Sequence, residues 1–509
     1  MKFSLLKTAV KGLIVGAAVF AFAGAAGATT TINLYGATAQ TNFWNGAAAD
    51  MLHVLFGCAT GAATVAGSSS SNVTHGTGCS SSFDAVDDSN HNGIINFSYT
   101  NKASWDGIMA VNGVWDSTNN GGAAQPCTNA NERSVATCVG TSCATANMTC
   151  QAITIGTSDV EASAFSQLSS GYQYGPLTGG ATALSRGFFL SDGITAGIDT
   201  TNLQPASTPI AYPFGFYVNP QVTTTRCTTS SPAAYINNYC LTETDCGGTV
   251  GTTTYCKAQT IDNLSRLQIV ALFGGSIANW HDFGAYYASL PVTLCMRHAG
   301  SGTSATLDLG IMEGNGWGNA LVQGENAVGG THVAPYVYFN DGTGDAQNCL
   351  KWVGGQSFST ERTTVPSTVL GGGVGYWDAD AGPYAGSNGV SPNPACQSGV
   401  TAPCGAYAGP IKFNGVLPTR ITMHDGMYDN FWTVNRMYVN TALTGVPLTM
   451  FQDIVNYLNS PANVTNALAS GVRGLYYGAA DELNFSKGSS ITYPYGYSPC
   501  SGSGCANPD

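Results

Sequence analysis

The stretch Leu294-Cys-Met-Arg297-His-Ala-Gly300-Ser301-Gly302-Thr303-Ser304-Ala-Thr306 joins two segments with different apolar patterns. Before Arg297, Leu290-Pro-Val-Thr-Leu-Cys-Met is a short apolar run that is typical of a buried strand. From Ala305 to Met312 the apolar residues follow helical spacing. The stretch therefore predicts a strand-to-helix junction at residues 301–304, where an arginine, glycines and hydroxyls lie close together.

The residue types at this junction suit a bound anion. The start of a helix offers unpaired N–H groups and the positive end of the helix dipole, and glycines let the backbone approach a ligand closely. The planar guanidinium of Arg297 can donate to two oxygens at once. An alternative that the stretch leaves open is an ordinary N-cap serine at a helix start, with Arg297 on the surface.

These residues resemble a known family. Arg297-His-Ala-Gly-Ser301-Gly302-Thr303-Ser304 resembles the Arg-x-x-Gly-Ser-Gly-Thr-Ser segment of the phosphate-binding proteins that serve ABC importers, which have a two-lobed type II periplasmic-binding fold. Further segments resemble the same family in the same order: Tyr35-Gly-Ala-Thr38, Tyr99 to Ile108, Gly156-Thr-Ser-Asp159, Leu267 to Asp282 and Gly373-Val-Gly-Tyr376.

The resemblance implies a set of ligand-binding residues and a role for one of them. The set is Thr38, Ala39, Ser104, Asp159, Arg297, Ser301, Gly302 and Thr303. Asp159 would accept a proton from the bound ligand. Two residues depart from the family: Ala39 replaces a phenylalanine, and Ala299 stands where an acid is frequent. The second departure puts strict selectivity for phosphate in doubt.

The resemblance also implies the fold class, an α/β, two-lobed type II periplasmic-binding-protein fold with Cys-rich loop insertions. Residues 29–213 and 428–509 would form lobe I, and residues 214–427 would form lobe II. The strand at Ile210–Asn219 would cross between the lobes, and the chain would return near Tyr428 to Tyr438. Apolar spacing predicts helices from about Thr41 to Phe56 and from Leu448 to Leu458, before an irregular tail at 484–509.

The N-terminus predicts secretion. Three lysines precede an uncharged stretch from Gly12 to Ala28 that ends in Ala-Gly-Ala, which is the layout of a signal peptide over residues 1–28. A membrane anchor is the alternative, but 17 residues rich in Ala and Gly are short for a span. The cleavage site has no cysteine, so nothing there indicates a lipoprotein. We therefore expect a periplasmic or extracellular monomer whose mature chain does not insert into a membrane.

The charge of the chain limits its partners. Without residues 1–28, which hold three lysines and no acidic residue, 14 basic side chains face 29 acidic ones, a net charge of −15. Such a surface repels nucleic acid. It also repels phosphate at long range, so binding of an anion must depend on local donors in a closed, dry cleft.

The sixteen cysteines predict disulfides in an oxidising compartment. They group as Cys58/Cys79, Cys127/Cys138/Cys143/Cys150, Cys227/Cys240/Cys246/Cys256, Cys396/Cys404 and Cys500/Cys505, which leaves Cys295/Cys349 as a longer-range couple. We expect up to eight bridges, mostly local, in inserted surface loops. Zinc is not expected because Cys-x2-Cys pairs are absent.

Other chemistries find little support. Asp88 to Tyr99 begins like a calcium loop, but Tyr99 stands where a bidentate carboxylate is required, so an Asn-Gly turn is the better interpretation. There is no Gly-x-Ser-x-Gly, His-Glu-x-x-His or Walker motif. His298 beside Arg297 could be mistaken for a catalytic base, while His53, His281 and His424 are expected to be packed or capping residues. No enzyme activity, cofactor or metal is expected.

Two hypotheses on function remain. The first is a solute-binding protein that holds phosphate or a similar tetrahedral oxyanion between two lobes, with an ABC permease as a possible partner. The second is a secreted surface or assembly protein that reuses the fold with altered or lost ligand binding. The Cys-rich insertions and the low share of charged residues, 9 %, favour the second hypothesis. The presence together of the ligand-binding residues that the resemblance implies favours the first.

Overall fold

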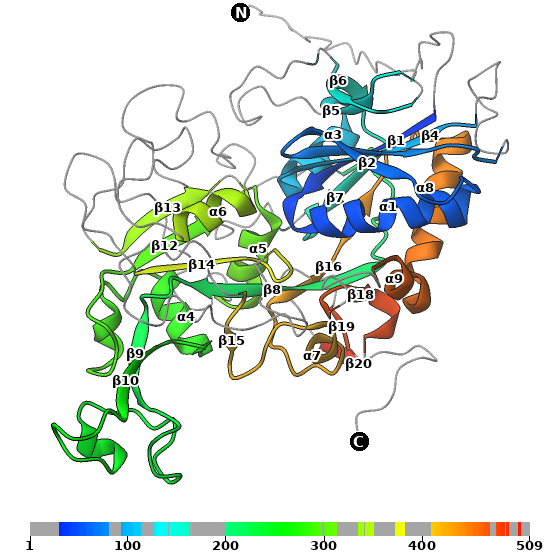
Figure 1. Cartoon of the computed structure of the whole chain (residues 1–509). Coiled ribbons are helices and arrows are strands. Elements are labelled where there is room, and N and C mark those ends of the chain that lie inside the picture. The colour runs from blue at the N-terminus through cyan, green and yellow to red at the C-terminus, as the bar shows by residue number, and fades with distance from the viewer. Residues whose placement is uncertain are drawn as a thin grey trace, which may run out of the picture.

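The computed structural model describes most of the chain. The described residues are 30–80, 93–113, 127, 129–140, 142–162, 164, 200–297, 300–312, 334–340, 342–350, 372–381, 409–468, 475–483, 485–487 and 497–499. They form two six-stranded sheets with helices around them, one in each of two lobes (Figure 1), and four smaller two-stranded sheets. Within these residues, no helix is both long enough and apolar enough to cross a membrane.

Lobe I is built on a six-stranded sheet in the order β17-β7-β1-β4-β3-β2. Its strands are β1 (Thr30–Ala37), β2 (Ala63–Ser68), β3 (Ser71–Gly76), β4 (Ile95–Lys102), β7 (Ile155–Ser158) and β17 (Arg436–Tyr438). β1 lies between β4 and β7 and is parallel to both, while β17 is antiparallel to β7. β2 and β3 come from the segment after Cys58 that was expected to be an inserted loop, and they extend the sheet instead.

The helices of lobe I follow their sequence patterns. They are α1 (Thr41–Phe56), α3 (Ser104–Asn112), α8 (Gly445–Leu458) and α9 (Pro461–Leu468). The predicted helix from Thr41 to Phe56 is confirmed, and it ends at Gly57, whose φ of 64° suits a glycine C-cap. The predicted helix at Leu448–Leu458 is also confirmed and begins three residues earlier. It buries Phe451, Ile454 and Leu458, as its spacing predicts.

Lobe II has its own sheet in the order β13-β12-β14-β8-β16, with β18 also paired to β8. Its strands are β8 (Ile210–Val218), β12 (Thr293–Arg297), β13 (Tyr336–Asn340), β14 (Gly373–Asp378), β16 (Trp432–Val434) and β18 (Gly478–Ala479). β12 lies between β13 and β14 and is parallel to both, and β8 is antiparallel to β14. The helices are α4 (Arg266–Phe273), α5 (Gly302–Gly310), α6 (Thr343–Leu350) and α7 (Arg420–His424).

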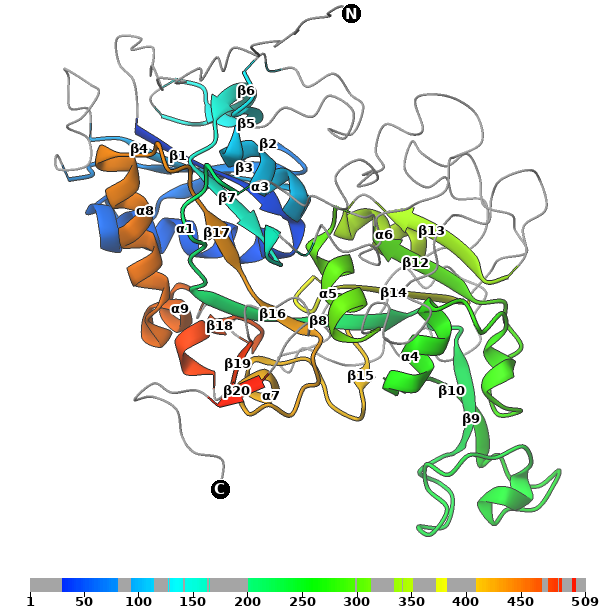
Figure 2. The same cartoon turned by 180° about the vertical axis from the view of Figure 1, so that it is seen from behind.

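The two sheets repeat one arrangement. In each, the first parallel strand lies between the second and the third, and an antiparallel strand pairs with the third. β8 and the pair β16–β17 join the lobes, as the views from both sides show (Figures 1 and 2). All nine residues of β8 are buried, which agrees with its continuous apolar sequence. The predicted α/β fold of two lobes is confirmed, whereas the division at 213/214 and 427/428 stays a prediction.

Smaller elements complete the fold. They are η1 (Thr38–Gln40), η4 (Glu243–Cys246), η5 (Trp280–Phe283), η9 (Ala480–Glu482) and the paired strands β5 (Glu132–Cys138) with β6 (Ala146–Ala152), β9 (Thr223–Cys227) with β10 (Cys256–Thr260), β11 (Asn263–Leu264) with β15 (Lys412–Phe413), and β19 (Phe485–Lys487) with β20 (Tyr497–Pro499). The last pair lies in the tail that was expected to be irregular. The hairpin β9–β10 projects away from lobe II (Figure 2).

Six disulfides join described cysteines, and five of them are local. They are Cys58–Cys79, Cys127–Cys150, Cys138–Cys143, Cys227–Cys246, Cys240–Cys256 and Cys295–Cys349. The expected clusters and the longer couple Cys295/Cys349 are confirmed. Cys396/Cys404, Cys500/Cys505 and the calcium-like segment up to Asn92 lie outside the described residues.

Candidate functional site

Three predicted site residues follow the parallel strands of lobe I. Thr38 comes directly after β1, Ser104 begins α3 two residues after β4, and Asp159 comes directly after β7. Parallel strands end at the same edge of a sheet, and ligands of open α/β sheets bind outside that edge. The fold therefore gathers these three residues at one edge of lobe I, although Thr38 and Asp159 are 121 positions apart in the chain.

The loop after β1 is held by hydrogen bonds that use up part of its polar groups. The hydroxyl of Thr38 donates to the carbonyl of Lys102. The carbonyl of Ala39 accepts from the Tyr477 hydroxyl at 2.9 Å, and the Ala39 side chain is buried. Thr38 and Ala39 therefore lie at the same edge as Ser104, but the Thr38 hydroxyl is already engaged by the protein.

Lobe II contributes Arg297 at the end of β12. Its side chain is only 1 % exposed, so the alternative of a surface arginine is wrong. The Nη1 group donates to the Thr343 hydroxyl at 3.4 Å, and that hydroxyl donates to Asp378 Oδ1 at 2.7 Å. The backbone N–H of Arg297 donates to the Tyr376 hydroxyl at 3.1 Å. Burial and these contacts hold the guanidinium in one place.

The junction after Arg297 has the predicted geometry. Ser301 is the N-cap of α5, and its hydroxyl accepts from the Ser304 N–H at 3.3 Å. The N-cap part of the alternative interpretation is thus correct, and Ser301, Gly302 and Thr303 are all buried. The Ser304 hydroxyl accepts from Tyr376 at 3.2 Å. The helix start is therefore enclosed. In such surroundings its dipole and its N–H groups interact more strongly with an anion than they would in water.

The two halves of the site touch. A Cβ added at Gly302 would lie 2.3 Å from the Ser104 hydroxyl oxygen and 2.9 Å from Asp159 Oδ2. The Thr303 hydroxyl lies 3.4 Å from Asp159 Oδ2 and donates to it, and the Trp105 N–H donates to the Gly300 carbonyl at 3.1 Å. Only a glycine at position 302 allows this approach. The lobes are closed on each other, with Ser104, Asp159, Gly302 and Thr303 at the contact.

Asp159 is fully enclosed. Its Oδ1 accepts from the Tyr212 hydroxyl at 2.5 Å, and its backbone N–H donates to the Ser104 hydroxyl at 3.1 Å. Burial raises the pKa of the Asp159 carboxyl, while the hydrogen bond from Tyr212 and the charge of Arg297 oppose the rise. Burial also raises the pKa of Tyr212 well above its usual value, and the charge of Asp159 adds to this. Tyr212 therefore keeps its proton and remains a donor to Asp159.

Two further acids of the site were missed in the sequence. Asp378 ends β14 and Asp380 follows it, and both are buried. Burial raises the pKa of Asp378 well above its usual value, and the charge of Asp380 adds to the rise, while the Thr343 hydrogen bond and Arg297 oppose it. The signal was present in Trp377-Asp-Ala-Asp380, directly after the segment Gly373–Tyr376 that resembles the family. Tyr212 gave no comparable signal, because it lies inside an unbroken apolar strand.

The histidines take no part in this arrangement within the described residues. His298 and Ala299 lie outside them. His53 contacts the Cys58 carbonyl at 2.7 Å, His281 the Tyr287 carbonyl at 3.1 Å, and His424 the Asp425 carboxylate at 2.6 Å. These three histidines have the structural contacts that were expected of them.

Two groups of described side chains bring three potential metal ligands together. They are His75 with Cys138 and Cys143, and Cys227 with Cys240 and Cys246. Every cysteine in them belongs to a disulfide, so none offers a thiolate while the bridges are closed. Neither group lies among the residues predicted to bind the anion.

No protein-family model matches the chain. Among solved structures, it is similar to a protein assigned as a phosphate ABC transporter substrate-binding protein with bound phosphate from Clostridium perfringens (10 % identity, 88 % of this chain, 99 % of the other, TM-score 0.38). It is also similar to a DING protein (11 % identity, 87 % of this chain, 90 % of the other, TM-score 0.39). A third similar structure is a phosphate-binding protein from Stenotrophomonas maltophilia (11 % identity, 86 % of this chain, 84 % of the other, TM-score 0.32).

At these low identities and TM-scores, the assignment of the fold depends on the strand order and connections of this chain. The central parallel strand, its two parallel neighbours and the antiparallel strand beside the third recur in both lobes. The chain therefore has a two-lobed α/β fold of the type II periplasmic-binding class, with Cys-rich insertions.

Proposed function

We propose that this protein is a periplasmic or extracellular solute-binding protein that holds phosphate or a similar tetrahedral oxyanion between its lobes. The proposed ligand-binding residues are Thr38, Ala39, Ser104, Asp159, Arg297, Ser301, Gly302 and Thr303. We further propose that it acts as a monomer in ABC-type uptake and performs no catalysis. The similar solved structures include proteins with bound phosphate, which is in keeping with this proposal.

One observation carries the proposal. The start of α5 comes from lobe II and lies against Ser104 and Asp159 of lobe I. The buried guanidinium of Arg297, also from lobe II, acts on the Asp159 carboxyl through its charge. A positive side chain, the N–H donors of a helix start and hydroxyls in a buried contact between lobes form a strong site for an oxyanion. Opening of the lobes would admit the ligand, and closure would exclude water from it.

Asp159 supplies selectivity in this scheme. Hydrogen phosphate carries a proton that it can donate to an ionised carboxylate, whereas sulfate has none at neutral pH. Tyr212 already donates to Oδ1, so the Oδ2 atom beside Gly302 and Thr303 is the proposed acceptor of the ligand proton. A buried acceptor without its donor costs about 1–3 kcal/mol, which disfavours sulfate.

The acidic surroundings favour a second candidate function. Asp159, Asp378 and Asp380 are all buried, and the charge of Arg297 acts on the first two of them, yet the pKa values of Asp159 and Asp378 are raised. Such a balance of charge opposes a doubly negative ligand unless carboxyls are protonated. A secreted surface or assembly protein with altered or lost ligand binding is therefore the alternative.

Calorimetric titration of the mature protein with phosphate, arsenate, sulfate and molybdate tests the proposal. We expect phosphate and arsenate to bind and sulfate to bind more weakly. The variant Arg297→Ala should bind phosphate at least tenfold more weakly, because a charged hydrogen bond contributes about 1.5–3 kcal/mol. If the folded wild-type protein binds none of the four anions, the alternative function replaces this one.

A further inference from the structure

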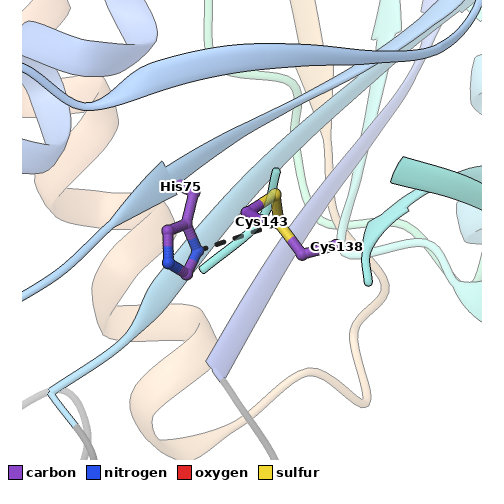
Figure 3. Close-up of side chains that lie close together, drawn as sticks. All are labelled: His75, Cys138 and Cys143. Carbon is purple, nitrogen blue, oxygen red and sulfur yellow. Dashed lines mark hydrogen bonds between the residues drawn. A yellow bond between two sulfur atoms is a disulfide. The ribbon is translucent and has the colours of Figure 1, made fainter. Parts of the chain in front are cut away.

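A disulfide and a histidine meet on lobe I (Figure 3), and an asparagine contacts both of them. Cys138 ends β5 and is bridged to Cys143 in the turn that leads to β6. His75 lies in β3 and Asn96 in the neighbouring β4, where they are paired across the two strands. Three segments of the chain thus bring one imidazole to one disulfide.

This disulfide contributes less to the fold than its neighbours. Its cysteines are five residues apart, whereas the other described bridges span 16 to 54 residues. The loop-entropy model gives the smallest stabilisation to the shortest loop. The hairpin that it closes is also held by seven residue pairs between β5 and β6 and by Cys127–Cys150. Opening Cys138–Cys143 would therefore leave the hairpin and the lobe folded.

The same bridge is within reach of solvent. Cys138 is half-buried, and its neighbour Val139 is 44 % exposed. Its partner Cys143 is buried, as Cys240 is in the bridge to the half-buried Cys256, whereas both cysteines of Cys227–Cys246 are completely buried. A small thiol can approach the turn at Cys138 without unfolding of the protein, which is the first requirement for exchange.

The position of His75 assigns it a chemical role. Its Nδ1 atom lies 2.7 Å from Asn96 Oδ1 and 3.7 Å from Cys138 Sγ. An amide oxygen and a disulfide sulfur can only accept, so this pair of neighbours places the hydrogen on Nδ1. Asn96 Oδ1 also lies 3.5 Å from Cys138 Sγ, so the two acceptors share this N–H. When the bridge opens, Cys138 becomes a charged acceptor and competes more strongly for the N–H, because a hydrogen bond to a charged acceptor is stronger than one to a neutral acceptor.

We propose that Cys138–Cys143 is a redox-active disulfide, that His75 stabilises the Cys138 thiolate, and that Asn96 positions His75. The reductant is a small thiol or dithiol. One thiolate attacks the bridge to give a mixed disulfide, and the electron pair of the broken bond passes to the other cysteine sulfur. A second thiol then displaces the protein, so the reductant leaves as a disulfide and Cys138 and Cys143 are both reduced. Stabilisation of the reduced form makes this bridge easier to reduce than the others.

The test is a redox titration of the mature protein in glutathione buffers, with acid quenching, alkylation and mass spectrometry of each cysteine pair. Cys138–Cys143 should open at ratios of reduced to oxidised glutathione that leave Cys227–Cys246 closed. The variant His75→Gln should lower the equilibrium constant for reduction about tenfold, which corresponds to about 30 mV. His53→Gln is the matched control, because His53 contacts the Cys58 carbonyl and not a sulfur atom, and it should change nothing.

A second measurement does not depend on the folding of a His75 variant. In Cys143→Ser the thiol of Cys138 is left beside His75, and in Cys138→Ser the thiol of Cys143 is left alone. Thiolate absorbance at 240 nm should develop at a lower pH for Cys138 than for Cys143. The inference is wrong if the two thiols ionise together. It is also wrong if the bridge opens only when Cys227–Cys246 opens, or if a folded His75→Gln protein has the wild-type equilibrium constant.

Discussion

Replacement of Gly302 by alanine should prevent the lobes from closing. Gly302 is the first residue of α5, and an added Cβ would lie 2.3 Å from the Ser104 hydroxyl oxygen and 2.6 Å from Asp159 Cβ. An ordinary contact begins at 3.4 Å, so the two surfaces would have to separate by about 1 Å at this point. The hydrogen bond from Thr303 to Asp159, already at 3.4 Å, would then be lost.

The size of the effect follows from the contact. Insertion of one extra carbon into a tightly packed contact typically costs about 1–3 kcal/mol. Because this contact joins the lobes, the cost applies to the closed state and should leave each separate lobe unaffected. Affinity for phosphate should therefore fall by roughly tenfold to hundredfold. Alanine is a better helix former than glycine, so the unliganded protein should be no less stable.

Calorimetric titration with phosphate, thermal unfolding and small-angle X-ray scattering together measure this prediction. In Gly302→Ala, phosphate should bind weakly, raise the unfolding temperature less than in wild type, and leave the protein more expanded. Gly344→Ala is the matched control: Gly344 also lies near the start of a lobe II helix, α6, but an added Cβ there would meet nothing within 4 Å. It should bind phosphate like wild type.

One result would refute the reasoning. If Gly302→Ala binds phosphate with wild-type affinity and reaches the same compact form, the contact between α5 and Ser104 is not part of the ligand-bound state. The proposed site at this contact would then be wrong, even if phosphate binds elsewhere.

Further expectations concern the charges and the packing of the site. Asp159→Asn should weaken phosphate binding by about 1–3 kcal/mol and narrow the difference between phosphate and sulfate, since an amide can donate to either ion; an unchanged ratio in calorimetric titration would contradict the role of Asp159. Arg297→Ala should instead weaken the binding of phosphate and of sulfate by similar factors, because the guanidinium of Arg297 contacts oxygens that both anions have. Folding raises the pKa of Asp378. Its contribution to stability is therefore fully present below its pKa in the unfolded chain, about 3.9, and is lost as the pH rises through its pKa in the folded protein. Scanning calorimetry should therefore show Asp378→Asn to be more stable than wild type at neutral pH, with the advantage disappearing in acid; a constant difference would contradict this. Gly107→Ala should lower the free energy of unfolding by about 1–3 kcal/mol in urea, because its Cβ would lie 2.4 Å from the Thr157 carbonyl oxygen, and a wild-type value would show that this contact can relax.

The disulfides show how far sequence reasoning extends. The local clusters and the couple Cys295/Cys349 follow from spacing alone, and the bridges confirm those whose cysteines the structure describes. Within a cluster of four cysteines, however, three connectivities are possible, and spacing does not choose among them. The nested pairing of Cys138–Cys143 inside Cys127–Cys150 depends on the register of β5 and β6, which only the folded hairpin defines.

The sequence by itself determined the local elements and the candidates at their ends. The helix at Thr41–Phe56, the strand from Ile210 and the junction at Ser301 are all local patterns of apolar spacing and capping, which act over a few residues. Resemblance added Ser104 and Asp159, and both lie directly against Gly302.

Only the tertiary structure decided what surrounds these residues. Tyr212 reaches Asp159 because β8 passes between the lobes, and Asp378 reaches Arg297 through Thr343 because β14 pairs with β12. These contacts join residues 35 to 53 positions apart, and no local pattern encodes them. Burial of these groups in one closed contact also sets their pKa values, so the charge balance of the site is a property of the fold and not of any single segment.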